Sequence, residues 1–502
     1  MASPLGLALL AVAASESMDA MRVAVLEHRV QKRATAFETM SANLEIYDLQ
    51  IQEAAQRGAK LLVTPEDGLT SFVGNQRALW WDYAASLPEP GQAEAQLPCI
   101  EASVWWPLRR LSCMALRHQV ALVASLIDMK DCTEEPEFPG CDSSRDGWLL
   151  LNTAVVLDRD GRLLQKYHKA NLWFEAALDE SKECSPKTFS ISGFEEVPFG
   201  IFICADLIHA WPPLELVTKG IRHFVMPLSW TNEMAQMQPL GWQQAWSHQM
   251  QAVLLAANTR SSSCSGSGIY VQGEAKAVAY DLEAQADQLL VTEVPLRLVE
   301  PAASPIGCPT SSDTRLLPVD EGSKWKSFQL DMTPGDHSST LCSAATCCHV
   351  SYRSRRQGEG YVLAVLNGLD ISPEVAPWAA EACAVLPCQS SSDCLTYPSE
   401  ALRQHSAKWF GEFESLEMEA NFSTTQEVFP QVLATSQRLL SPRAWHLHRG
   451  ARSGAETTLR LALNGSAVEE LVSLQLYGRP YSRDSDIQQH CHCGPKVEGV
   501  LV

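Results

Sequence analysis

The sequence contains no apolar run of about 18 residues or more, which is the length that a membrane-spanning helix requires. It also lacks a long cluster of Lys or Arg, and its formal net charge of −20 repels polyanions. Internal repeats and low-complexity tracts are absent as well. We therefore expect no transmembrane segment and no nucleic-acid partner. With 46% hydrophobic and 20% charged residues, the chain is typical of a globular protein that buries a large core.

Cysteine is abundant instead. Sixteen cysteines are many for a cytosolic enzyme, and close pairs such as Cys132 and Cys141 favour disulfides in an oxidising compartment. Residues 1–14 combine an apolar run with an Ala-Val-Ala pattern and resemble a signal peptide, with a frayed N-terminal tail as the alternative. Asn421 and Asn464 each begin an Asn-X-Ser tripeptide, which is compatible with glycosylation. We predict a secreted, extracellular glycoprotein with a Cys132–Cys141 disulfide.

The length of 502 residues predicts two folded units, because single hydrophobic cores stop growing well below that size. Strand and helix patterns alternate over residues 21–298, which indicates a layered α/β domain. A linker is expected over residues 299–315. From residue 316 onward the chain mixes strand-like runs with half of the cysteines, which predicts a smaller, mostly β, cysteine-rich domain over residues 316–484, followed by a tail over residues 485–502.

Within the first domain, the hydrophobic spacing predicts individual elements. An apolar run at residues 23–26 predicts a buried strand, and residues 60–64 and 120–127 predict two more. Residues 149–157 and 163–167, separated by an Asp-Arg-Asp-Gly turn, predict a β-hairpin. One helical face is predicted between residues 37 and 54, on steps of three and four residues: Phe37, Met40, Leu44, Tyr47, Ile51 and Ala54.

Three residues follow predicted strands and carry suitable chemistry for cleaving an amide. Cys204 follows the apolar run at residues 199–203, Glu66 follows the strand at 60–64, and Lys169 follows the hairpin. An amide is a poor electrophile with a poor leaving group, so its hydrolysis needs a nucleophile, a proton shuttle and a stabiliser of negative charge. Each residue alone has an ordinary explanation: a buried structural thiol, a loop acid or an exposed lysine.

Together these stretches resemble a known order. The sequences around Glu66, Lys169 and Cys204 resemble the Glu-Lys-Cys triad regions of the nitrilase superfamily. More narrowly, they look like the branch that contains the vanins and biotinidase, and the similarity runs from about residue 22 to residue 484. The resemblance implies an αββα sandwich, followed by the C-terminal domain of that branch.

The resemblance also implies a mechanism without metal or organic cofactor. Glu66 is expected to take the thiol proton, Cys204 to attack the carbonyl carbon and Lys169 to stabilise the oxyanion, leaving a thioester on Cys204. A lysine beside the thiol is expected to favour the thiolate. Glu175 matches the additional glutamate that many nitrilases place after the lysine, with a simple loop acid as the alternative.

The acyl pocket is less well defined by these motifs. By analogy, Trp230 and Asn232 are expected to border it. Ala205 stands where the vanins and biotinidase are expected to carry a bulky aromatic residue, which leaves the pocket shape open. The segment at residues 171–179 looks closer to biotinidase than to the vanins. The expected substrate is a small-molecule amide of the biotinyl-lysine or pantetheine class.

Two other functions stay open at this point. The same thioester is able to pass its acyl group to an amine instead of water, which would make the protein an acyltransferase. A non-catalytic secreted glycoprotein is also able to retain the scaffold, because a fold does not guarantee chemistry. The presence of Glu66, Lys169 and Cys204 together argues against the second alternative. If Cys204 is a free thiol, fifteen cysteines remain, so at least one more is unpaired or intermolecular.

Overall fold

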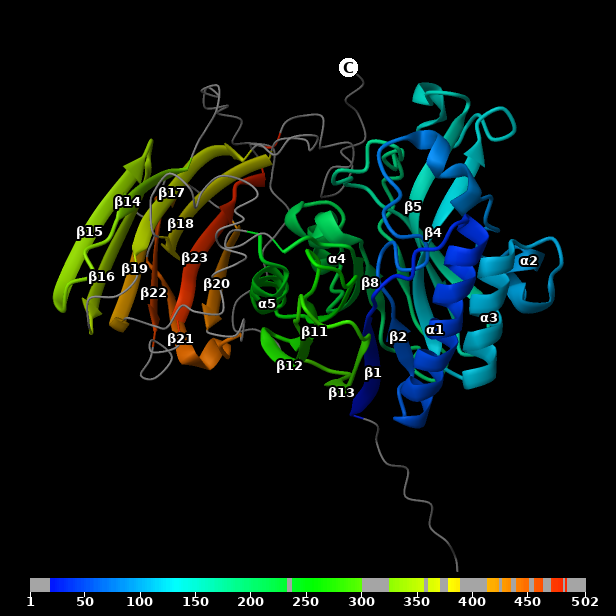
Figure 1. The fold of residues 1–502 in the computed structure, drawn as a ribbon, viewed down its shortest axis with the longest axis horizontal. Coiled ribbons are helices and arrows are strands. Elements are labelled where there is room, and N and C mark those ends of the chain that lie inside the picture. Colours follow the sequence, from blue (N-terminus) through cyan, green and yellow to red (C-terminus); the bar gives the residue numbers. More distant parts are fainter. Residues whose placement is uncertain are drawn as a thin grey trace, which may run out of the picture.

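A computed structural model of the chain describes two packed units, drawn in Figure 1. The signal-peptide prediction, Asn464, the C-terminal tail and all but residue 299 of the predicted linker lie outside the described residues. No described helix is long and apolar enough to cross a membrane. The described residues are 19–232, 237–299, 325–355, 360–370, 378–388, 413–423, 427–434, 439–450, 456–463, 471–481 and 484.

The first unit contains two sheets that face each other. Apolar residues of alternate positions in the first sheet, such as Val23 and Val25, pack against apolar residues of the second sheet, such as Ile201 and Val225. The first sheet has the order β13-β1-β2-β4-β5-β6, with β3 beside β4. Its strands are β1 (Ala20–Glu27), β2 (Leu61–Val63), β3 (Ala84–Ala85), β4 (Ala121–Asp131), β5 (Trp148–Leu157), β6 (Leu163–His168) and β13 (Gln288–Pro295). The second sheet has the order β12-β11-β10-β9-β8-β7, formed by β7 (Thr188–Phe189), β8 (Phe199–Ile201), β9 (His223–Leu228), β10 (Val253–Asn258), β11 (Ser267–Val271) and β12 (Glu274–Ala279).

Helices cover the two outer faces. The intervening positions of β1, such as Ala24 and Leu26, pack against α1 and α3, which lie side by side on one outer face in Figure 1. On the other side, α5 packs against β10 and β11. The layers are therefore helix, sheet, sheet and helix, which confirms the predicted αββα fold. The helices are α1 (Ala36–Gln56), α2 (Ala93–Gln96), α3 (Trp106–His118), α4 (Pro213–Thr218) and α5 (Pro239–Met250).

Helix α1 is the predicted amphipathic helix. Its N-terminus is closed by a capping box, in which Thr35 accepts from the Glu38 backbone N–H and Glu38 accepts from the Thr35 backbone N–H. Five of the six predicted face residues are buried, from Met40 to Ala54. The prediction for Phe37 is wrong, because its side chain is 64% exposed and lies against the Trp106 ring of α3 instead of the sheet.

The second unit is a β sandwich. Its two sheets enclose an apolar core, and the Cys348–Cys383 disulfide joins β16 of one sheet to β18 of the other. A second disulfide, Cys342–Cys347, closes the β15–β16 hairpin. One sheet contains β14 (Lys326–Gln329), β17 (Tyr361–Asp370), β18 (Trp378–Pro387), β23 (Leu471–Arg479) and β20 (Glu427–Ala434), in that order. The other contains β15 (Gly335–Ser343), β16 (Thr346–Ser354), β19 (Phe413–Ser423), β22 (Glu456–Leu463) and β21 (Trp445–Arg449).

In the first unit, the structure joins Cys132 to Cys141 and Cys99 to Cys113. The free thiols among the described residues are Cys204 and Cys264. Asn421 lies near the end of β19, where its side-chain oxygen accepts a hydrogen bond from Thr458.

The two units share a packed interface. Trp242 of α5 contacts the rings of Phe429 and Tyr477 from the second unit. The buried guanidinium of Arg479 donates to the backbone oxygen of Ile208 in the first unit at 2.8 Å and pairs with Asp484 at 2.7 Å. Ile208 ends the short 3₁₀ helix η5 (Cys204–Ile208). The second unit therefore contacts the element on which the candidate nucleophile lies.

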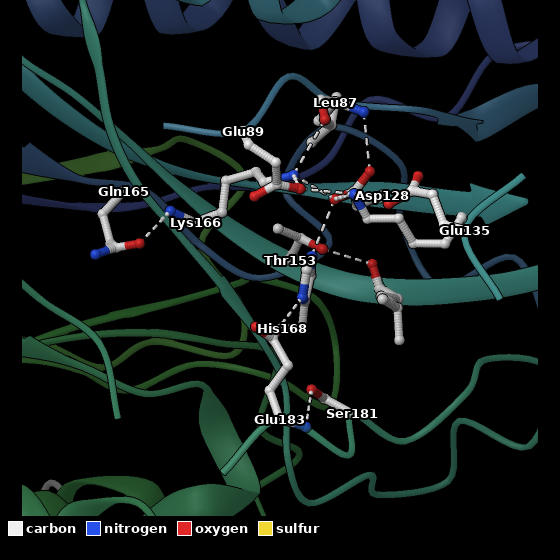
Figure 2. Close-up of polar contacts among 12 residues, drawn as sticks. Leu87, Glu89, Asp128, Glu135, Thr153, Gln165, Lys166, His168, Ser181 and Glu183 are labelled. Atoms are coloured by element: carbon white, nitrogen blue, oxygen red, sulfur yellow. Dashed lines mark hydrogen bonds and ion pairs between the residues drawn. The ribbon is translucent and has the colours of Figure 1, made fainter. Parts of the chain in front are cut away.

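A buried cluster of charges lies beside β6. Asp128 Oδ2 accepts from Lys166 Nζ at 2.7 Å and pairs with His168 Nε2 at 2.9 Å, and His168 Nδ1 pairs with Glu183 at 2.5 Å, as Figure 2 shows. Burial opposes ionisation of Glu183, but His168 and Lys187 outweigh it and lower the pKa of Glu183 to about 2. Burial likewise acts to lower the pKa of His168, but Asp128 and Glu183 raise it. This cluster anchors the strand that ends directly before Lys169.

We predict that Glu183→Gln lowers the free energy of unfolding by about 2 kcal/mol at pH 7, and by progressively less as the pH falls toward 3. A carboxylate with a depressed pKa stabilises the fold above its unfolded pKa of about 4.3, and this contribution is lost as the pH falls through the folded value. Urea unfolding at several pH values measures the difference. Glu196→Gln, at an exposed position, is the control. An equal deficit at pH 7 and pH 3 would contradict the prediction.

Candidate active site

The candidate site lies where strand ends of the two facing sheets meet. Glu66 follows β2 and Lys169 follows β6 in the first sheet, while Cys204 follows β8 in the second. All three side chains line one cavity and are at least 94% buried. The structure therefore brings together the three residues that the sequence picked out separately.

The ammonium of Lys169 lies between the carboxylates of Glu66 and Glu175. Its ammonium donates to Glu66 Oε1 at 2.7 Å and makes a short contact with Glu175 Oε2. Asn152 of β5 donates from Nδ2 to Oε1 of the same two carboxylates, at 2.7 Å to Glu66 and 2.6 Å to Glu175. The backbone N–H of Ser229 donates to Glu66 Oε2 at 2.8 Å. Glu175 is thus part of the cluster, and not a solvated loop acid.

Cys204 is held on a turn that points its thiol into the cavity. Its backbone is left-handed, with φ of 47°, at the start of η5. Asp206 fixes this turn by accepting from the Ile203 backbone N–H at 2.8 Å, and it also accepts from the Asn171 backbone N–H at 2.9 Å. Because Asn171 lies two residues after Lys169, the buried Asp206 joins the loop of Cys204 to the loop of Lys169. Burial raises the pKa of Asp206 to about 6.

The cavity has a volume of about 480 Å³, within the usual range for small-molecule sites. One part of its wall is aromatic, and another carries hydroxyl and thiol groups. Ala205, beside Cys204, also faces the cavity. The aromatic residues are Phe72, Trp173, Phe174 and Trp230, and the second group contains Ser71, Ser229, Thr231, Thr259, Ser261, Ser263 and Cys264.

The two predicted pocket residues behave differently. Trp230 lines the cavity, with its indole N–H donating to the backbone oxygen of Met237 at 2.9 Å. Asn232 does not line it, so the prediction for this residue is corrected. Its side chain is buried and donates to the hydroxyl of Tyr280 at 2.5 Å, while its backbone N–H donates to Ser263. Asn232 therefore supports the loop at residue 263 through this backbone hydrogen bond, without lining the cavity itself.

Comparisons with known proteins agree with this geometry. Residues 22–270 match the carbon–nitrogen hydrolase family, and residues 315–484 match the vanin C-terminal domain. A biotinidase from Takifugu rubripes is 31% identical over 95% of this chain and 98% of its own length. The chain belongs to the vanin and biotinidase branch of the carbon–nitrogen hydrolases.

Other relatives in this branch are more distant. A pantetheinase from Canis lupus familiaris is 26% identical over 97% of this chain and 94% of its own. Among solved structures, an amidase from Nesterenkonia sp. is 22% identical over 55% of this chain and 90% of that chain, with a TM-score of 0.40. Membership of the branch makes the protein a hydrolase that acts on amides, which confirms the predicted enzyme class.

Two polar residues of this hydrolase's site were missed by sequence reasoning. Asn152 is the only strongly polar residue within the apolar run of β5. This interruption of the run is the sequence feature from which a site residue could have been predicted. Asp67 also lines the cavity, in a left-handed conformation with φ of 53°. Burial raises the pKa of Asp67 well above its usual range, and the neighbouring Glu66 and Glu175 raise it further. The site therefore favours the neutral form of the Asp67 carboxyl group.

Lys169 lowers the pKa of Cys204, in the expected direction, but other influences outweigh it. Burial raises the pKa of Cys204 well above its ordinary value, Glu66 raises it further, and Lys169 only opposes them. Burial also acts to lower the pKa of Lys169, but Glu175 and Glu66 outweigh it and raise that pKa. Because two carboxylates share the single positive charge of Lys169, little of that charge is left for the thiol. Cys204 is a neutral thiol in the resting site.

We predict that Glu66→Gln makes Cys204 react faster with iodoacetamide at pH 7 to 8. The substitution removes a negative charge that raises the pKa of Cys204, so the thiolate fraction increases. Peptide mapping by mass spectrometry reports the labelling rate of Cys204, and Cys264 in the same sample serves as the internal control. Unchanged or slower labelling of Cys204 would show that Glu66 does not suppress its thiolate.

Proposed function

We propose that the protein hydrolyses a linear secondary amide between a small carboxylic acid and an amine, through a thioester on Cys204. The observation that carries this proposal is the shared cavity, in which one thiol faces a lysine flanked by two carboxylates. The relatives named biotinidase and pantetheinase support the same class of substrate.

In the first step, Cys204 Sγ bonds to the carbonyl carbon while its proton passes to Glu66. General-base assistance is needed because burial keeps the thiol neutral. The carbonyl oxygen becomes an oxyanion, which the buried ammonium of Lys169 stabilises. The tetrahedral intermediate then collapses, the C–N bond breaks and the amine leaves with the proton from Glu66.

In the second step, Glu66 takes a proton from water, and the resulting hydroxide attacks the thioester carbon. Lys169 again stabilises the oxyanion. Collapse breaks the C–S bond, releases the carboxylic acid and returns the proton from Glu66 to Cys204. Glu66 thus acts twice as acid and base, while Glu175 keeps Lys169 charged and in place.

The cavity favours a neutral acyl group. Its described lining contains two cationic side chains, Lys169 and Arg260. Lys169 is engaged by the two glutamates, and Arg260 is engaged by Glu27 at 2.8 Å and by Gln288 at 3.1 Å. A carboxylate on the acyl group would therefore meet no uncommitted cation among these residues. Biotinyl and pantothenoyl groups both satisfy this requirement.

We predict measurable hydrolysis of biotinyl-lysine, pantetheine or both by the purified protein, and no reaction with simple nitriles. Both substrates carry a linear secondary amide next to a flexible chain, so the acyl pocket discriminates between them. Mass spectrometry of the products, with and without an added amine, separates hydrolysis from acyl transfer. Cleavage of nitriles without cleavage of either amide would contradict the proposed substrate class.

We predict that Lys169→Ala lowers kcat by about a hundredfold or more, since loss of one donor to an oxyanion typically has that effect. Cys204→Ala is the matched control for background turnover, because a methyl group fills much of the space of the thiol without being nucleophilic. Steady-state kinetics measure both variants, and circular dichroism checks their fold. An effect of Lys169→Ala on KM alone would contradict its role.

A further inference from the structure

We infer that Asn152 is the positioning residue of this active site, because its amide donates to both Glu66 and Glu175 and so holds the two side chains in place around Lys169. The inference deepens the proposed function, because it concerns the same proton shuttle. The supporting observation is the set of hydrogen-bond donors to the four carboxylate oxygens of Glu66 and Glu175.

Each oxygen of the two glutamates has an identified donor. Glu66 Oε1 accepts from Asn152 and Lys169, and Glu66 Oε2 accepts from the Ser229 backbone. Glu175 Oε1 accepts from Asn152, and Glu175 Oε2 accepts from Lys169 and from the Trp173 backbone N–H at 3.0 Å. Among the described residues, Asn152 is therefore the only neutral side chain that bridges the pair. Its two amide hydrogens serve one carboxylate each.

A hydrogen bond to its oxygen fixes the orientation of the Asn152 amide. Ser125 of β4 donates from its hydroxyl to Asn152 Oδ1 at 3.4 Å, which leaves the NH₂ group facing the glutamates. The backbone oxygen of Asn152 accepts from the Lys169 backbone N–H at 2.8 Å. A single residue of β5 thus sets the position of the lysine through its backbone and of both carboxylates through its side chain. Asn152 is buried, with 1% of its surface exposed.

The charge balance explains why a neutral donor is needed here. Two carboxylates share one ammonium, so the cluster carries one uncompensated negative charge in a buried site. Burial raises the pKa of Glu175, while Lys169 and the hydrogen bond from Asn152 oppose that rise. A second cation at this position would compete with Lys169 for the glutamates, and an anion would repel them. An amide supplies two hydrogen-bond donors without competing with Lys169 and without repelling the glutamates.

The test is Asn152→Asp, which keeps the shape of the side chain, removes both donors and adds a negative charge. We expect kcat/KM to fall by about a hundredfold, as for other small displacements of catalytic groups. We also expect the acidic limb of its pH profile to move up by about one pH unit. Ser125→Ala, which removes only the orienting hydroxyl, should change both quantities in the same direction by less. Asn367→Asp, at a half-buried asparagine of the second unit that donates to Thr346, is the matched control and should leave the profile unchanged.

A second measurement does not depend on turnover. The added charge should raise the pKa of Cys204, so that labelling of this thiol by iodoacetamide requires a higher pH in Asn152→Asp than in the wild type. Wild-type protein that cleaves no amide would refute the proposed function, while the labelling profile would still decide the role of Asn152. A folded Asn152→Asp variant with unchanged labelling and activity profiles would overturn the inference.

Discussion

The structure of the site depends on one buried ammonium shared by two carboxylates. Lys169, Glu66 and Glu175 are each at least 93% buried, and such charges persist only where their partners compensate for the loss of water. Neutral donors contribute to that compensation: the Asn152 amide and the backbone N–H groups of Ser229 and Trp173 all point at the carboxylates. The same arrangement leaves the thiol neutral, so the proposed attack by Cys204 requires a proton acceptor.

This requirement determines how the strands must be placed. The groups around Lys169 come from β2, β5 and β6 of one sheet and from the ends of β8 and β9 in the other. A register slip of one residue in β5 would turn Asn152 to the opposite face and remove both of its donated bonds. The antiparallel pairing of β5 with β4 and with β6 fixes that register on both sides. Asp206 adds a link between the loops of Cys204 and Lys169.

The second unit is joined to the same elements. Arg479 donates to the last residue of η5, whose first residue is Cys204, and Trp378 packs against Trp173 with ring centroids 5.1 Å apart. Trp173 in turn lines the cavity and donates its backbone N–H to Glu175. The vanin-type domain supplies no residue to the described cavity lining, but it supports two parts of its wall.

The sequence by itself determined the layered α/β domain, the β-rich second domain and the order of Glu66, Lys169 and Cys204, because hydrophobic periodicity and motif order are local properties. The exposure of Phe37, the displacement of Asn232 from the cavity and the neutral state of Cys204 were decided by the tertiary structure. So was the role of Asn152, whose partners lie 86 and 23 residues away along the chain. Burial and Coulomb interactions depend on distances in space between residues far apart in the sequence, and local spacing does not contain those distances.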